Sequence, residues 1–218
     1  MKAESIVETV NEKAHYRQLS DIFKSKSLWC DNICFVGDSL SSNSVRIKAK
    51  SIWILGEMGL CYCKEIAKYI DSIAGYMRAS EPLLRERAVG AIGRIGRADY
   101  SLIEPYFSDI LSLANDSEPS VRLNFIWASE NIATTAPQSY EGHMELFAKL
   151  LHDQNNRVRM EAPEMFRVIG KRLPQLALPY LNELTELSEN DPEPVVRIHS
   201  CGAIKAIRKD RNSNEIYR

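Results

Sequence analysis

The segment LRERAVGAIGRIG, residues 84–96, decides the fold because it is one of five related segments spaced evenly along the 218-residue chain. Each of them begins with an aliphatic residue followed by a basic one. The basic residues are Lys48, Arg85, Arg122, Arg159 and Arg197, at intervals of 37, 37, 37 and 38 positions. A fixed period of this length is typical of a repeat protein, in which stacked units share one continuous core.

Each segment carries the spacing of an amphipathic helix. The positions three, seven and ten residues after the basic residue are mostly apolar or small, as in Ala88, Ile92 and Ile95, and they fall on one helical face. A second helical segment precedes most of these, at 65–77, 101–114, 143–153 and 177–188. A short polar turn joins the two, so each unit consists of a first helix (helix A), a turn and a second helix (helix B).

We therefore predict an all-α fold, a right-handed α-solenoid of about five helical hairpins with an N-terminal helical cap. Residues 1–27 form the cap, 28–210 the solenoid and 211–218 a polar tail. The hairpins span about 28–60, 65–97, 100–134, 139–171 and 176–208. No low-complexity linker interrupts the chain, so we place no internal domain boundary.

Glycines recur in two phases of helix B, although each costs about 1 kcal/mol relative to alanine in a helix interior. Gly56 and Gly93 lie eight residues after the basic residue, where we expect a neighbouring helix to come close. Gly59, Gly96 and Gly170 lie eleven residues after it, where we expect the left-handed residue that commonly ends a helix.

These segments resemble the inner helix of the HEAT-repeat family: an aspartate, a short gap, V-R-x-x-A and then a small, apolar L-G-x-I-G. The resemblance covers roughly residues 28–210, and the segment 84–96 is the nearest copy. The first two repeats depart from the pattern, with Ser42 and Ala79 in place of the aspartate. The period is shorter than the ~40–47 residues usual for the family, so the chain is similar to its compact bacterial type. The resemblance implies that helices B line a concave surface.

Charge and composition limit the partners. The chain has 28 basic and 29 acidic residues, and this balance argues against a general phosphate-binding surface while leaving room for a local basic face. No stretch reaches the ~18 apolar residues of a membrane helix, and the N-terminus lacks the apolar core of a signal peptide. We expect a soluble cytoplasmic protein whose five cysteines are reduced.

An aspartate lies six residues before the arginine in each of the last three repeats. The pairs are Asp116 and Arg122, Asp153 and Arg159, and Asp191 and Arg197. We expect each aspartate to cap the amides at the start of helix B and each arginine to bridge to a neighbouring turn's aspartate. Recurrence in successive repeats indicates a packing device, because a catalytic site needs to occur only once.

Two tryptophans, Trp53 and Trp127, lie five residues after their basic residue, off the apolar stripe and toward the open face of helix B. Tryptophan exposed in a groove favours binding; the alternative is that an adjacent helix partly covers each ring. The candidate partner-binding residues are Trp53, Arg87, Arg94, Leu123, Asn124, Trp127, Asn131, Met160 and Glu164.

Our leading hypothesis is a non-enzymatic scaffold that holds a protein or peptide on the helix B face, with apolar anchoring at Trp127, Trp53, Leu123 and Met160. An alternative is a nucleic-acid binder, or an enzyme similar to the DNA-alkylation-repair glycosylases, using the basic half around Trp53, although the cations are few. The family resemblance also implies a weaker alternative, a bilin-lyase-like enzyme.

Four cysteines, Cys30, Cys34, Cys61 and Cys63, offer the thiolates of a zinc site, but their spacings are not those of C-x-x-C knuckles. We favour packing roles for these cysteines and for Cys201, since cysteine is often buried. No zinc-protease, serine-hydrolase, P-loop or dinucleotide motif occurs. We therefore predict no metal, no cofactor and no catalytic residues.

Overall fold

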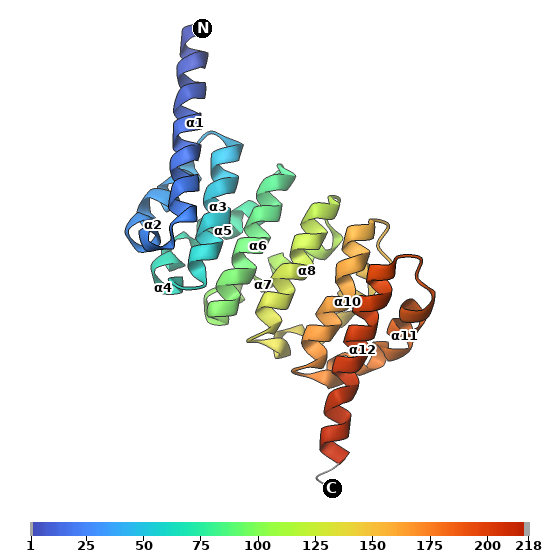
Figure 1. Ribbon diagram of the computed structural model, residues 1–218. Coiled ribbons are helices and arrows are strands. Elements are labelled where there is room, and N and C mark those ends of the chain that lie inside the picture. Colours follow the sequence, from blue (N-terminus) through green and yellow to red (C-terminus); the bar gives the residue numbers. More distant parts are fainter. Residues whose placement is uncertain (1, 216–218) are drawn as a thin grey trace. The chain divides into compact units, whose positions relative to one another are not determined.

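The computed structural model describes the backbone of residues 2–215 and the side chains of residues 10–209. Over this range the chain forms helices and no strand (Figure 1). It divides into two compact units, residues 1–105 (unit 1) and residues 106–218 (unit 2), and each unit is described by itself.

Unit 1 starts with a long helix followed by two helical hairpins. Its elements are α1 (Lys2–Lys24), η1 (Lys26–Leu28), α2 (Trp29–Asp38), η2 (Ser39–Ser41), α3 (Val45–Gly59), α4 (Cys63–Ile66), η3 (Ala67–Tyr69), α5 (Ile70–Gly75), η4 (Tyr76–Arg78), α6 (Pro82–Ala98) and η5 (Tyr100–Leu102). The helices B of this unit are α3 and α6, which pack against each other, and α1 packs on α3.

Unit 2 holds three helices B, α8 (Pro119–Ala133), α10 (Asn156–Gly170) and α12 (Pro194–Glu215), with α10 packed between the other two (Figure 1). Its remaining elements are α7 (Phe107–Ser112), η7 (Leu113–Asn115), η8 (Pro137–Tyr140), α9 (Met144–Leu150), η9 (Pro174–Leu176), η10 (Leu178–Tyr180) and α11 (Leu181–Asn190). Because α12 extends to Glu215, residues 211–215 of the expected polar tail are helical; residues 216–218 lie outside the described range.

The helices A are shorter and more broken than their periodicity predicts. Each combines a short α-helix with turns of 3₁₀-helix, and η6 (Glu104–Tyr106) and η10 both contain a proline, Pro105 and Pro179. Proline removes a backbone donor and its ring clashes with the preceding turn, so an α-helix cannot run through these positions undisturbed. The helices B, in contrast, are continuous.

The glycines of helix B permit close packing rather than left-handed turns. A Cβ on Gly56 would lie 2.6 Å from the Cα of Ala91 on α6, as expected from its phase. Our prediction of left-handed residues at Gly59, Gly96 and Gly170 is wrong, because Gly142 alone has a positive φ among the described residues. A Cβ on Gly59 or Gly170 would instead come within 2.5 or 2.7 Å of an isoleucine of the next helix B.

The aspartates and arginines of unit 2 form a ladder between successive repeats. Asp153 accepts hydrogen bonds from Nε and Nη2 of Arg122 at 2.7 and 2.8 Å, while Nη1 of Arg122 donates to the carbonyl of Asp116 at 2.7 Å. Burial alone would raise the pKa of the Asp153 carboxyl, but the bonds from Arg122 hold it below its usual value. Each arginine thus ties its own turn to the next one.

The next rung repeats these contacts. Nε of Arg159 lies 3.3 Å from Oδ2 of Asp191, and Nη1 of Arg197 donates to the Asp191 carbonyl at 2.6 Å. Each aspartate accepts a hydrogen bond from the backbone amide two residues later. That amide belongs to the residue just before helix B and not to the helix itself. The aspartates therefore shape the turn, and the helix starts where the turn ends.

Adding one methyl group at Gly56 tests the close approach of α3 and α6. We expect Gly56→Ala to lower the free energy of unfolding by about 1–3 kcal/mol, because backbone atoms cannot yield as a flexible side chain does. Urea unfolding followed by circular dichroism measures it. Gly75→Ala is the matched control, since nothing lies within 4 Å of its Cβ; it should be neutral or stabilising by up to ~1 kcal/mol. Equal effects of the two changes would contradict the close approach.

Candidate functional site

The exposed tryptophan of α8 marks a candidate binding face on unit 2. Trp127 has 38% of its surface exposed. Asn131, one turn later, donates from Nδ2 to the Trp127 carbonyl at 2.8 Å, and Asn124, one turn earlier, donates to the Ser120 carbonyl at 3.0 Å. We call the surface formed by Asn124, Trp127 and Asn131 the Trp127 face. Its amide side chains are held by their own helix, which fixes their orientation.

One carboxyl oxygen beside this face is buried and has no hydrogen-bond partner among the described residues. It is Oε1 of Glu130, which lies three residues after Trp127. Burial raises the pKa of the Glu130 carboxyl to about 8, and the charges of Glu161 and Glu164 on α10 add to the shift. The group therefore holds a proton near neutral pH. We call these three residues the carboxyl cluster.

One of the other carboxyl groups of the cluster, that of Glu164, is partly neutralised. Arg167 forms an ion pair with Glu164, and the hydrogen bond that it donates to Glu164 raises the pKa of the Arg167 guanidinium. His199 on α12 places Nδ1 3.9 Å from Oε1 of Glu164 and donates to the Met160 carbonyl at 2.7 Å. The side chain of Met160 is half-buried. The carboxyl cluster thus lies on α8 and α10, and His199 brings a third helix B of the same unit beside it.

Leu123 does not belong to an accessible surface. Its side chain is only 5% exposed, so the predicted apolar anchor at this position is wrong: Leu123 is part of the core of the folded chain. It lies one residue after the basic position, where Ala49 of α3 is also buried.

The predicted residues of unit 1 lie in a different setting. The Trp53 ring packs on Phe23 of α1 with centroids 4.1 Å apart, so an adjacent helix covers part of it, as the alternative reading expected. Arg94 forms an ion pair with Glu57 of α3 at 2.7 Å and is engaged inside the unit. Arg87 is half-buried and lines a pocket beside Trp53.

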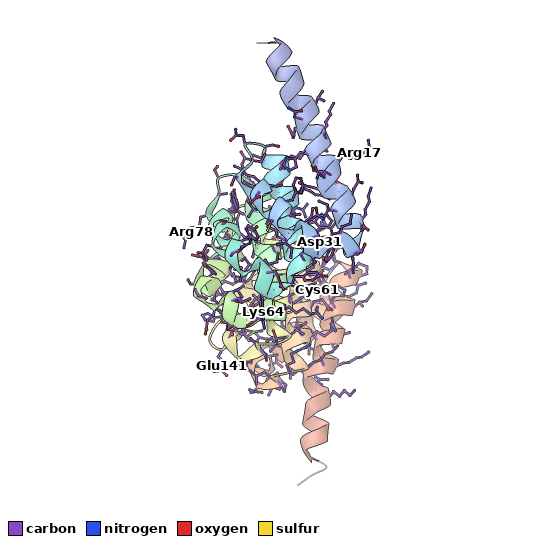
Figure 2. The ribbon with its side chains drawn as sticks, turned by 90° about the vertical axis from the view of Figure 1, so that its left-hand side faces the viewer. Arg17, Asp31, Cys61, Lys64, Arg78 and Glu141 are labelled. Carbon is purple, nitrogen blue, oxygen red and sulfur yellow. The ribbon has the colours of Figure 1, made fainter. Side chains whose placement is uncertain are left out.

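The cysteines are free thiols and mostly exposed, so the predicted packing role is wrong for Cys30, Cys34, Cys61 (labelled in Figure 2) and Cys201; Cys63 is half-buried. Cys201 lies on α12, where no later helix B of the described chain covers this phase. Across residues 10–209, no group of three or more histidine, cysteine, aspartate or glutamate side chains is placed to hold a metal ion. None of the helices in the same range has the length and apolar character needed to cross a bilayer.

Our sequence reasoning missed Glu130, although a signal was present. Glu130 lies eight residues after Arg122, in the phase of Gly56 and Gly93, where a neighbouring helix comes close. The last two repeats carry Arg167 and Lys205 at this position, and Glu130 is the one carboxylic acid among the five. A carboxylic acid at a position where a neighbouring helix comes close is therefore a usable sign of a perturbed pKa.

Comparison with known proteins places the fold. No family model matches the sequence, and no curated protein matches it. Solved structures do match, over 88–89% of this chain and 89–91% of theirs: an engineered protein (15% identity, TM-score 0.70), a designed armadillo repeat protein in complex with the peptide (KR)4 (20%, 0.68) and computationally designed armadillo repeat proteins for modular peptide recognition (19%, 0.64). The chain has an all-α repeat solenoid fold. The predicted fold class is confirmed.

The pKa of Glu130 makes stability depend on pH. Between pH 4.5 and about 8 the folded state keeps a proton that the unfolded state releases, so the free energy of unfolding falls as pH rises, by up to ~1.4 kcal/mol per pH unit. We expect Glu130→Gln to flatten this slope in urea unfolding at pH 5, 6.5 and 8. Replacing the exposed Glu141 (labelled in Figure 2) by glutamine should leave it unchanged. A wild-type slope in Glu130→Gln would show that Glu130 titrates normally.

Proposed function

We propose that this chain is a non-enzymatic scaffold that binds a peptide with basic side chains on the Trp127 face of unit 2. The observation that supports this most is the exposed Trp127 beside a buried carboxyl oxygen that has no partner. The indole supplies an apolar anchor, and the charges of Glu161 and Glu164 supply a negative field. A lysine or arginine side chain suits both features, because its aliphatic part packs on the indole and its charge meets the negative field.

The tryptophan contributes in two ways. Its large ring buries much apolar surface against a partner while losing little conformational entropy, and tryptophan is enriched among the residues that dominate binding energy. The face of the ring also attracts a cation, an interaction that strengthens when water is excluded. Asn124 and Asn131 lie one turn to either side, where a chain that runs along α8 passes them.

The carboxyl cluster favours a cationic ligand for a separate reason. The charges of Glu161 and Glu164 lie beside Glu130, and a bound ammonium or guanidinium group balances them. A cation near Glu130 also lowers the pKa of its carboxyl and favours its ionised form.

The structural comparison supports peptide binding at the level of the fold. One designed armadillo repeat protein with this fold is in complex with the alternating basic peptide (KR)4, and other designed members are described as made for peptide recognition. At 15–20% identity the likeness extends to the fold alone. Membership of the HEAT-repeat family, a cytoplasmic location and the absence of catalysis are parts of the same proposal.

The enzymatic alternatives have less support. A glycosylase-like reaction needs an aspartate on the same face as the aromatic residues. The three ladder aspartates lie instead in turns, where backbone amides hold each of them and arginines bridge Asp153 and Asp191. No contact among the described residues favours a bilin-lyase-like reaction over peptide binding.

Titration with the (KR)4 peptide tests the proposal. We expect Trp127→Ala to weaken binding about tenfold or more, the usual cost of truncating a central tryptophan. Ile198→Ala is the matched control, because Ile198 is a 66% exposed apolar residue on another helix B of the same unit and should leave affinity unchanged. A (DE)4 peptide should bind Trp127→Ala and the wild-type chain equally, because acidic side chains do not suit the Trp127 face. Wild-type affinity of Trp127→Ala for (KR)4, or an equal loss of (DE)4 binding in that variant, would refute the proposal.

A further inference from the structure

A second candidate site lies in unit 1 and has the opposite charge. A pocket of about 230 Å³ opens above α3, lined by Tyr16 of α1, by Arg46, Ala49, Lys50 and Trp53 of α3, and by Leu83 and Arg87 of α6. Among the described residues that line it, three are cationic and none is acidic. We call it the cationic pocket.

Two of the three cations of this pocket contact aromatic rings. The Arg46 guanidinium lies 3.9 Å from the centre of the Tyr16 ring, and Lys50 Nζ lies 4.4 Å from that of Trp53. Arg87 forms a loose ion pair, with Nη2 3.5 Å from Oε1 of its own chain neighbour Glu86. Aromatic faces hold cations in position without neutralising them. The pocket therefore concentrates positive charge that a ligand can satisfy.

The charges in the pocket repel one another. Burial lowers the pKa of the Lys50 ammonium, and the nearby positive charges of Arg87 and Lys24 lower it further. A bound anion offsets this repulsion between the cations. The three cations come from two helices that pack against each other, so the arrangement exists before any ligand arrives. Binding therefore costs little conformational entropy in the protein.

The size and charge of the pocket indicate which anion fits. A volume of 230 Å³ is below the roughly 300–1,000 Å³ of pockets for whole cofactors or drug-sized ligands, so it suits one substituent rather than a nucleotide. Three cations exceed what one carboxylate needs, whereas a phosphate monoester carries nearly two negative charges and three terminal oxygens. Arginine and lysine are the residues that recognise phosphate in this way.

We propose that the cationic pocket binds a phosphate monoester carried on the side chain of a peptide. Arg46, Lys50 and Arg87 contact the phosphate oxygens, and Trp53, Ala49 and Leu83 pack against the stem that carries them. This site lies outside the peptide face proposed for unit 2 and does not depend on it. The pocket brings only three cations together in a chain of net charge −1, which favours a single phosphate group over a continuous nucleic-acid backbone.

Calorimetric titration of the full chain tests the site with three probes: a peptide containing one phosphotyrosine, the same peptide unphosphorylated, and a single-stranded oligonucleotide. We expect the phosphorylated peptide to bind at least about tenfold more tightly than the unphosphorylated one, since charge-assisted hydrogen bonds are lost without the phosphate. Inorganic phosphate should displace the peptide only at much higher concentration, because it lacks the stem.

Single substitutions separate the pocket from general charge effects. Arg46→Gln, Lys50→Gln and Arg87→Gln should each weaken phosphopeptide binding about tenfold, while circular dichroism shows an unchanged fold. Lys64→Gln is the matched control, because Lys64 (labelled in Figure 2) is an exposed cation of the same unit on α4; it should have no effect. Trp127→Ala should also leave phosphopeptide binding unchanged, so failure of one proposed site is distinguishable from failure of the other.

Four results would overturn the proposal. Equal affinity for the two peptides would show that the phosphate is not recognised, and an equal loss in Lys64→Gln would show only general attraction. Tighter binding of the oligonucleotide, with a steep salt dependence, would identify a nucleic-acid surface. Displacement by inorganic phosphate at the concentration of the peptide would identify a site for free anions.

Discussion

Successive helices B must come close enough to share one apolar core, and the other features of each unit depend on that approach. In unit 1 the absence of a side chain at Gly56 lets α3 rest on the backbone of α6 at Ala91. In unit 2 Gly170 provides the same freedom opposite Ile207. The arginine–aspartate ladder then sets the register, because each guanidinium joins the turn before its own helix to the turn before the next one.

Exceptions to this packing coincide with the surfaces that suit a ligand. Glu130 places a carboxyl group, which prefers water, against α10, where burial and the charges of Glu161 and Glu164 raise its pKa. In unit 1 the long helix α1 covers part of α3 and brings Tyr16 beside Arg46 and Lys50. The two candidate sites therefore differ in sign: the one beside Trp127 attracts cations, and the one beside Trp53 attracts anions.

The repeat period and the amphipathic spacing were enough to predict the helices B, because positions three, seven and ten residues after the basic residue must all face one core. The same pattern could not distinguish the two uses of a glycine near a helix end: Gly59 and Gly170 serve close packing, although their position equally suits a left-handed turn. It also could not locate the breaks in the helices A, where Pro105 and Pro179 favour 3₁₀ geometry.

The candidate sites were harder to predict than the fold. The exposure of Trp127 is predictable because its position lies off the apolar stripe of helix B. Leu123 occupies a nearby position on the helix that was wrongly predicted to be exposed. The cationic pocket needs Tyr16 from a helix outside the repeat pattern and Arg46 from the start of α3. No periodicity relates these two residues, and only the packing of α1 on α3 brings them together.

Native-state amide hydrogen exchange tests the central claim, that stacked helices B form the stable core of each unit. The account predicts that the slowest amides belong to α3 and α6 in unit 1 and to α8 and α10 in unit 2, which open only when the unit unfolds. The broken helices A at residues 63–78 and 174–190 should exchange faster through local opening. Equal or greater protection of those segments would contradict the account.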